Sequence, residues 1–122
     1  MATKYNSLGG ILYSKGEYDK AIEYYEKALK IRVKVLEEDH PDVATNYNNL
    51  GSAWYSKGEY DKAIECCEQA LKIQLKILWT EHPNVAANYD YLSLVWRKKG
   101  EYDKAIEYFK KALKIWFEIL GP

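Results

Sequence analysis

The chain has 122 residues, a length that suits one ordinary domain with a real core. Its 18 Lys and Arg residues balance 18 Asp and Glu residues, which disfavours a nucleic acid partner because phosphate binding needs a basic surface. No apolar run approaches the ~20 residues that span a bilayer and nothing resembles a signal peptide, so we expect no membrane association and a cytoplasmic location.

A segment of eight residues recurs at a fixed spacing. Residues 16–23 read GEYDKAIE, and the same letters stand at 58–65 and 100–107, 42 residues apart each time. Fixed-period similarity of this kind predicts a stack of repeats in which each copy buries its apolar face against its neighbours. We therefore expect a single domain of three copies, over residues 1–38, 39–80 and 81–122.

The first copy carries two helical patterns. Apolar residues at the i, i+3 and i+7 spacing share one face of a predicted helix over residues 1–15, and Gly16 is placed to close it in the left-handed conformation. A second helix is predicted from residue 18 to about residue 38, because its apolar residues follow the 3.6-residue period. The apolar stripe of this second helix consists of Ala21, Ile22, Tyr25, Ala28, Leu29, Val33 and Leu36.

Short junctions connect each copy to the next. Pro41 suits the first turn of a helix, where a missing N–H costs nothing, and Asp39 or His40 is the expected cap. His40 and His82 occupy the same place in successive copies, and we interpret them as turn residues because a structural zinc site needs four N or S donors. The remaining helices are predicted over residues 41–57, 60–78, 83–99 and 102–120, which makes six antiparallel helices.

Two cysteines, Cys66 and Cys67, are adjacent on a helical pattern. Neighbouring residues of a helix point about 100° apart, so we expect no disulfide between them, and neither belongs to a CxxC spacing. Cys67 falls where the other copies have Tyr25 and Phe109, which indicates a small buried core residue. A redox or metal role would need a partner that the sequence does not show, so no metal or cofactor is predicted.

The copies resemble the tetratricopeptide repeat, whose pattern is W-x2-L-G-x2-Y followed by A-x3-F and a proline. In the second copy the pattern reads Tyr47-x2-Leu50-Gly51-x2-Trp54 and then Ala63-x3-Cys67. The third copy has Ser93 in place of the glycine, which affects only local packing. The resemblance covers the whole chain and implies an all-α, right-handed α-solenoid of three helix-turn-helix repeats.

The period of 42 residues is longer than the usual 34 of this family. The Asp-His-Pro-Asp-Val-Ala junction at residues 39–44 and the Tyr-x-Asn-Leu-Gly opening at 47–51 resemble the repeats of kinesin light chains and of nephrocystin-type arrays. The eight extra residues amount to roughly 12 Å of helix at 1.5 Å per residue, shared between the two helices of each copy.

A resemblance to tetratricopeptide repeats implies a binding scaffold without catalytic activity. Stacks of this family hold an extended peptide or a partner helix in a groove lined by the first helices. The groove-facing positions map to Asn6, Gly10, Tyr13, Asn48, Ser52, Tyr55, Asp90, Leu94 and Arg97. Grooves of the kinesin light chain type take short peptides with a Trp flanked by acids, for which Asn6 and Asn48 would contact the backbone and Arg97 an acid. In the alternative interpretation, these asparagines only solvate a polar face.

Self-assembly is the alternative function. The sequence starts inside its first helix and ends on a repeat like the others, without the polar capping helix that solenoids normally need. Trp116, Phe117, Ile119 and Leu120 would then form an apolar surface through which copies stack end to end or exchange helices. An enzyme is not expected, because the sequence has no Ser/His/Asp order and no Gly-rich phosphate loop after a strand.

Overall fold

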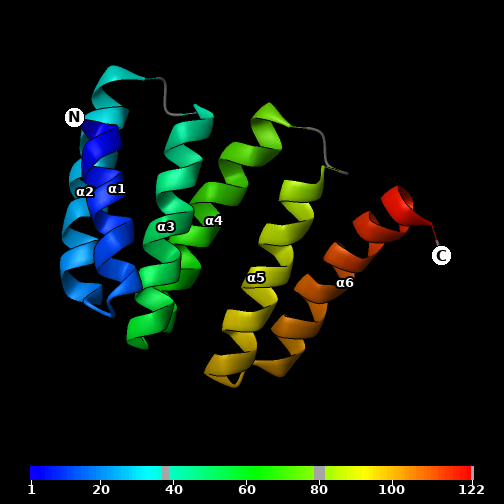
Figure 1. Ribbon diagram of the computed structural model, residues 1–122. Helices are drawn as coiled ribbons and strands as arrows, with labels where there is room; N and C mark the ends of the chain where they lie inside the picture. Colours follow the sequence, from blue (N-terminus) through cyan, green and yellow to red (C-terminus); the bar gives the residue numbers. More distant parts are fainter. Residues whose placement is uncertain (37–38, 79–81, 122) are drawn as a thin grey trace.

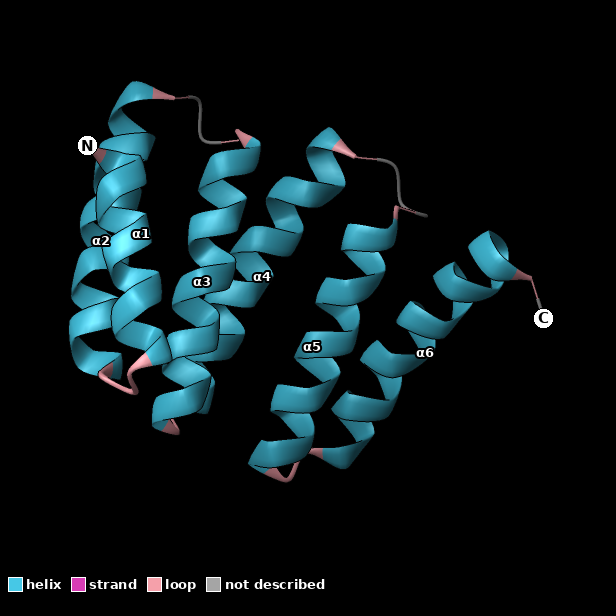
Figure 2. Cartoon of the chain, viewed as in Figure 1, coloured by secondary structure: helices cyan, strands magenta, loops and turns pink. Residues whose placement is uncertain are grey.

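The computed structural model describes residues 1–36, 39–78 and 82–121. In these ranges the chain forms α-helices joined as antiparallel hairpins, and no strand occurs there (Figures 1 and 2). The helices are α1 (Ala2–Ser14), α2 (Tyr18–Val35), α3 (Pro41–Lys57), α4 (Tyr60–Ile77), α5 (Pro83–Lys99) and α6 (Tyr102–Leu120). The all-α solenoid of helical hairpins expected from the sequence is therefore confirmed.

Consecutive helices are neighbours throughout the stack. Within the hairpins α1 packs on α2, α3 on α4 and α5 on α6, while α2 contacts α3 and α4 contacts α5 between hairpins. The first helices of the three hairpins form one layer and the second helices form the other, with the two termini at opposite ends (Figure 1). Each repeat therefore contacts chiefly its neighbours, as in other solenoids.

Glycine closes the first helix of every hairpin. Gly16, Gly58 and Gly100 have φ angles of 84°, 90° and 92°, in the left-handed region that disfavours residues with a Cβ. A Cβ added at these positions would meet no atom within 4 Å. The backbone conformation, rather than a lack of space, therefore selects glycine, as predicted for Gly16.

The junctions between hairpins are capped by histidine. His40 Nδ1 accepts a hydrogen bond of 3.0 Å from the backbone N–H of Asp42, and His82 Nδ1 accepts an equal bond from the N–H of Asn84. Both histidines stand at the N-cap with proline directly after them, so the predicted helix starts and the role of His40 as a cap are confirmed.

The second helix ends earlier than predicted. α2 stops at Val35, because Leu36 is extended with φ −107° and ψ 166°, whereas the sequence pattern carried the helix to about residue 38. Residues 37 and 38 of that prediction lie outside the described ranges. Leu78 has the same extended conformation after α4, so the chain uses this position to start its reversal toward the next repeat.

The core runs through the stack as a ribbon between hairpins. On α2 the buried side chains are Ala21, Ile22, Tyr25 and Ala28, and on α4 the equivalent ones are Ala63, Ile64, Cys67 and Ala70. Val33 was placed in the buried stripe by its spacing, but it is 40% exposed, so that part of the prediction is wrong. It borders a hollow of about 160 Å³ that it shares with Val43 and Tyr47 of α3 and with residues of α4, so the neighbouring helices do not pack tightly on it.

Ion pairs cross both junctions at the same register. Lys57 Nζ lies 2.6 Å from Asp19 Oδ1, and Lys99 Nζ lies 2.6 Å from Asp61 Oδ1. All four side chains are exposed, so each pair contributes little to the free energy of unfolding. Their value here is as markers that the two junctions have the same geometry.

The helices of a hairpin approach closely where one of them carries a small residue. A Cβ on Gly9 would lie 2.7 Å from the ring of Tyr25, and one on Gly51 would lie 2.9 Å from Cys67 Sγ. Ser93 takes this place in the third repeat, where its hydroxyl donates a 2.8 Å hydrogen bond to the carbonyl oxygen of Ala105. The departure from glycine is thus accommodated locally.

This contact predicts opposite effects for two adjacent glycines of α1. Gly9→Ala should lower the free energy of unfolding by about 1–3 kcal/mol, because the buried ring of Tyr25 must move. Gly10→Ala meets only the Tyr25 hydroxyl at 3.7 Å and should be neutral or stabilising by up to about 1 kcal/mol. Urea unfolding followed by circular dichroism measures both, and equal midpoints for the two variants would contradict the packing.

The two thiols should be slow to react in the folded protein. Burial raises the pKa of Cys66 to about 11 and that of Cys67 to about 12, and nearby carboxylates add to both shifts. A pKa two units above normal lowers the thiolate fraction at pH 8 by roughly 100-fold. Alkylation by iodoacetamide at pH 8 should therefore be at least that much slower in buffer than in denaturant. Equal rates in the two solvents would show that the thiols are accessible.

Candidate functional site

Three hollows follow one another along α5, and the first of them lies where α5 faces α3. The first, of about 340 Å³, is lined by Thr45, Asn48, Ser52, Gln74, Asn84, Ala87, Asn88 and Tyr91. The second, of about 310 Å³, is lined by Ala87, Asp90, Tyr91 and Leu94. The third, of about 120 Å³, is lined by Asp90, Ser93, Leu94, Arg97 and Phe109. Because successive hollows share residues, we treat them as one feature, the α3–α5 groove.

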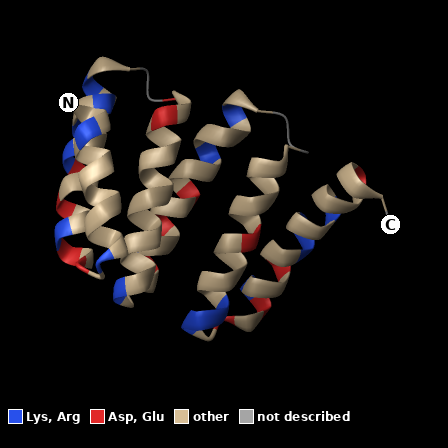
Figure 3. Ribbon diagram, in the orientation of Figure 1, with Lys and Arg blue, Asp and Glu red and all other residues tan. Residues whose placement is uncertain are grey.

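The first hollow of the groove is polar but uncharged. Its lining side chains are amides, hydroxyls and one alanine methyl. Figure 3 shows the charged residues gathered on α2, α4 and α6 and near the helix ends, with most of α1, α3 and α5 free of them. Asp90 and Arg97 bring one charge of each sign to the other end of the groove. The groove therefore changes along its length from hydrogen-bonding amides to opposite charges.

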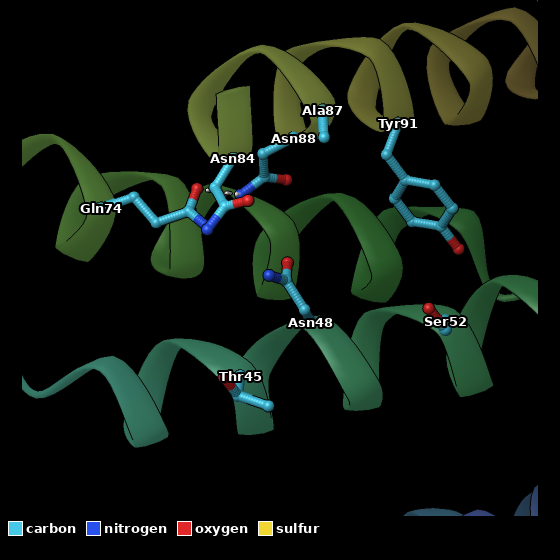
Figure 4. A pocket seen from close by; sticks show the side chains of 8 residues that line it. All are labelled: Thr45, Asn48, Ser52, Gln74, Asn84, Ala87, Asn88 and Tyr91. Atoms are coloured by element: carbon cyan, nitrogen blue, oxygen red, sulfur yellow. Dashed lines mark hydrogen bonds between the residues drawn. The ribbon is translucent and has the colours of Figure 1, made fainter. Parts of the chain in front are cut away.

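Five of the predicted groove residues lie along this feature, among them Leu94, which lines the second and third hollows. Asn48 and Ser52 line the first hollow, and in Figure 4 both project from α3 toward α5. Asp90 lines the second and third hollows, and Arg97 lines the third. Residues from two repeats are thus brought onto one continuous surface.

Asn6, by contrast, is engaged in a contact between repeats. Its Oδ1 accepts hydrogen bonds from the Nδ2 groups of Asn49, at 3.1 Å, and Asn46, at 3.5 Å. These bonds cross from α1 to α3 at the first junction. The side-chain amide oxygen of Asn6 therefore already accepts hydrogen bonds from donors of this chain.

The two predicted tyrosines also contact other helices. The Tyr13 hydroxyl shares a 2.9 Å hydrogen bond with the hydroxyl of Ser56. The rings of Tyr55 and Tyr91 lie 5.7 Å apart between α3 and α5. Burial raises the pKa of Tyr91 to about 12, so its hydroxyl stays a neutral donor at physiological pH. These aromatic side chains therefore contact residues of the neighbouring repeat.

Sequence reasoning missed two buried asparagines beside the groove. Asn46 Nδ2 donates to the carbonyl oxygen of Tyr25 at 3.3 Å, and Asn88 Nδ2 donates to that of Cys67 at the same distance. Each bond fastens the first helix of one repeat to the second helix of the repeat before it. The signal was present, because an asparagine recurs at the 42-residue period beside apolar positions.

The apolar surface expected on the last helix is present but larger than predicted. Phe117, Ile119 and Leu120 are exposed, whereas Trp116 is half-buried and packs on the core. Ile106, Phe109 and Leu113 are exposed as well, and the sequence analysis did not single them out for this surface. Aligning the repeats could have revealed these three residues, because the equivalent residues of α4 are buried under the following repeat.

Residues 1–36, 39–78 and 82–121 contain no group of three or more His, Cys, Asp and Glu side chains able to hold a metal ion. None of the helices described is long and apolar enough to cross a membrane.

Solved structures with similar folds cover nearly the whole chain. The nearly identical TPR-like repeats assigned to a kinesin light chain of Podosopora anserina share 26% identity at a TM-score of 0.84, over 97% of this chain and 56% of that one. BtubC (BKLC) from P. vanneervenii shares 27% identity at a TM-score of 0.80, over 98% and 47% of the two chains. This chain thus spans about half the length of either protein.

A structure from yeast extends this comparison to a protein with a bound partner. The TPR2AB domain of Sti1, solved in a complex named for pHSP90, shares 28% identity at a TM-score of 0.75, over 94% of this chain and 41% of that one. No curated protein sequence matches the chain. The sequence model of the tetratricopeptide repeat matches residues 1–74 and 53–116, most of the length. The chain therefore belongs to the tetratricopeptide repeat family.

Proposed function

We propose that the protein is a non-catalytic module that binds an extended peptide or a partner helix in the α3–α5 groove. The observation that carries this proposal is the row of connected hollows lined by side chains of two successive repeats. A ligand lying across both repeats would contact amides at one end and charges at the other. The complex of yeast Sti1 with pHSP90 supports binding by this fold in general.

The residues of the groove favour recognition of a peptide backbone over capture of a terminal carboxylate. Asn48 offers both a donor and an acceptor, which match a peptide C=O and N–H, and Ser52 adds a hydroxyl. Capture of a carboxylate would favour clustered cations, whereas the cation at this surface, Arg97, lines the same hollow as Asp90. An acidic side chain of a peptide would meet Arg97 at the far end of the groove.

A peptide-display selection with groove variants tests the proposal. Asn48→Ala and Arg97→Ala should each lower the affinity for captured peptides by roughly 10-fold, as expected for the loss of one or two hydrogen bonds. Gln69→Ala and Lys110→Ala remove an exposed amide and an exposed cation from the other layer of helices and should leave affinity unchanged. Fluorescence anisotropy with the selected peptides gives the dissociation constants.

Two results would count against the groove. Selected peptides that bind all four variants equally would place the binding surface elsewhere. If Gln69→Ala lowers the affinity for peptides as much as Asn48→Ala does, the loss of affinity is not specific to the groove.

Self-association is a second candidate function, and the exposure of α6 favours it. Ile106 is 52% exposed, although Ile22 and Ile64 at the same repeat position are 5% and 7% exposed beneath the following helix. On α1, Leu8 is 39% exposed, whereas the equivalent Leu50 is 3% exposed against the preceding repeat. The molecule therefore presents both halves of its own repeat interface.

A second copy would fit these surfaces by placing its α1 on α6, as α3 lies on α2 and α5 on α4. Such a contact joins different surfaces of two molecules, so it can extend into a chain of copies instead of closing as a dimer. The Ile11 side chain, 60% exposed on α1, would be buried with it.

Light scattering over a concentration series tests this second function. The protein should show a mass that rises with concentration, and Ile106→Lys should shift it to monomer because a buried charge opposes the contact. Val35→Lys alters an equally apolar exposed residue on α2 and should leave the mass unchanged. A constant monomer mass for the unmodified protein at the highest concentration would exclude this association.

A further inference from the structure

The two junctions between repeats use the same buried asparagine with different partners. At the first junction Asn46 receives a hydrogen bond at its Oδ1 from Arg32 Nη1. The same guanidinium nitrogen donates to the backbone oxygen of Asp42 at 3.3 Å. Both hydrogen-bonding ends of the Asn46 amide are therefore satisfied, since its Nδ2 donates to Tyr25.

The second junction lacks this guanidinium. Gln74 stands at the repeat position of Arg32, and its Oε1 accepts a 3.1 Å hydrogen bond from Asn88 Nδ2. Asn88 Oδ1 is left without a partner, although Asn88 is only 5% exposed. Figure 4 shows the dashed bond between the two amides and the Asn88 oxygen turned away from it. A buried acceptor of this kind costs free energy until a donor reaches it.

A further substitution leaves space for a ligand at this junction. At the first junction Asn49 bonds to Asn6 and bridges α1 and α3. Tyr91 and Asn48 occupy the equivalent positions in the next repeat, and no hydrogen bond joins them in the described part of the chain. The hollow of about 340 Å³ lies here, with Gln74 and Asn88 in its wall.

We infer that the first hollow of the α3–α5 groove binds the guanidinium of a ligand arginine, which donates to Asn88 Oδ1 as Arg32 donates to Asn46. The inference rests on the proposed groove function and specifies a side chain that the ligand carries. Gln74 is itself buried, at 8% exposed, and one hydrogen bond holds its amide to Asn88, so the guanidinium has to displace the Gln74 amide as it enters.

Arginine fits the hollow better than lysine for two reasons. Its planar fork of N–H groups can reach two amide oxygens at once, and Asn48 offers such an oxygen beside Asn88. The carboxylate of Asp90 lines the adjoining hollow, which shares Ala87 and Tyr91 with the first. A cation entering the first hollow therefore approaches a negative charge.

The test uses N-acetyl-L-arginine amide as the probe, with N-acetyl-L-lysine amide as its control. In ¹H–¹⁵N NMR spectra of the whole protein, the arginine probe should shift the side-chain amide signals of Asn88 and Gln74 in a saturable manner. For so small a ligand we expect a dissociation constant of about 1 mM or weaker. The lysine probe should bind several-fold more weakly.

The chain supplies its own matched variant. Gln74→Arg recreates the arrangement of Arg32 at the second junction, so its guanidinium should fill the hollow and reduce probe affinity at least 10-fold. Gln74→Met keeps the length of the side chain without a charge, and the probe should still bind. The amide spectrum of each variant verifies that it is folded.

Three results would overturn the inference: unmoved Asn88 signals, equal shifts from the two probes, or undiminished probe affinity in Gln74→Arg. Its failure is distinguishable from failure of the groove. Peptides that are weakened by Asn48→Ala but bind equally well to Gln74→Arg would retain the groove and reject the arginine site. If no peptide is captured but the arginine probe still shifts the Asn88 signals, the arginine site is retained and the peptide groove is rejected.

Discussion

Helices α2 and α4 each bury one face under the first helix of the repeat that follows, and the other properties of the molecule depend on this contact. Ile22 and Ile64 are buried by it, and Ile106, at the same position of the last hairpin, is exposed. The same contact carries the buried asparagine bonds from α3 to α2 and from α5 to α4. Apolar burial supplies most of the free energy, and the asparagines add a hydrogen bond at the same place in each junction.

Much of the fold could be predicted from the sequence because its local signals agree with its period. The glycine after α1, the proline and histidine before α3, and the 3.6-residue stripes lead to the same hairpins. The end of α2 was predicted too late, since Leu36 continues the apolar stripe past Val35 in the sequence although its backbone is extended. The burial of Val33 was predicted wrongly, because periodicity assigns a residue to a face of the helix but does not show how closely the neighbouring helices pack on it.

The candidate site was less accessible to sequence reasoning. Helical spacing places Asn6 and Asn48 on the same face, and the structure separates them by their partners rather than by their position. Asn6 is bonded across the first junction because Asn49 reaches it, while tyrosine stands in place of Asn49 in the next repeat. Changes at a few equivalent positions, such as Asn49 to Tyr91 and Arg32 to Gln74, thus distinguish the two junctions, and repeat alignment alone gives Asn6 and Asn48 equal weight.

The ion pairs Asp19–Lys57 and Asp61–Lys99 join equivalent positions of successive repeats. The carbonyl oxygens of Tyr25 and Cys67 likewise accept equivalent asparagine hydrogen bonds from the following repeat. The side chains of Ile22 and Ile64 are buried at equivalent positions of the two repeats. An in-frame duplication of one 42-residue unit would therefore arrive with these shared junction contacts already encoded. Arrays built in this way can gain length through single genetic events, and the differences that accumulate afterwards are free to give each junction its own ligand preference.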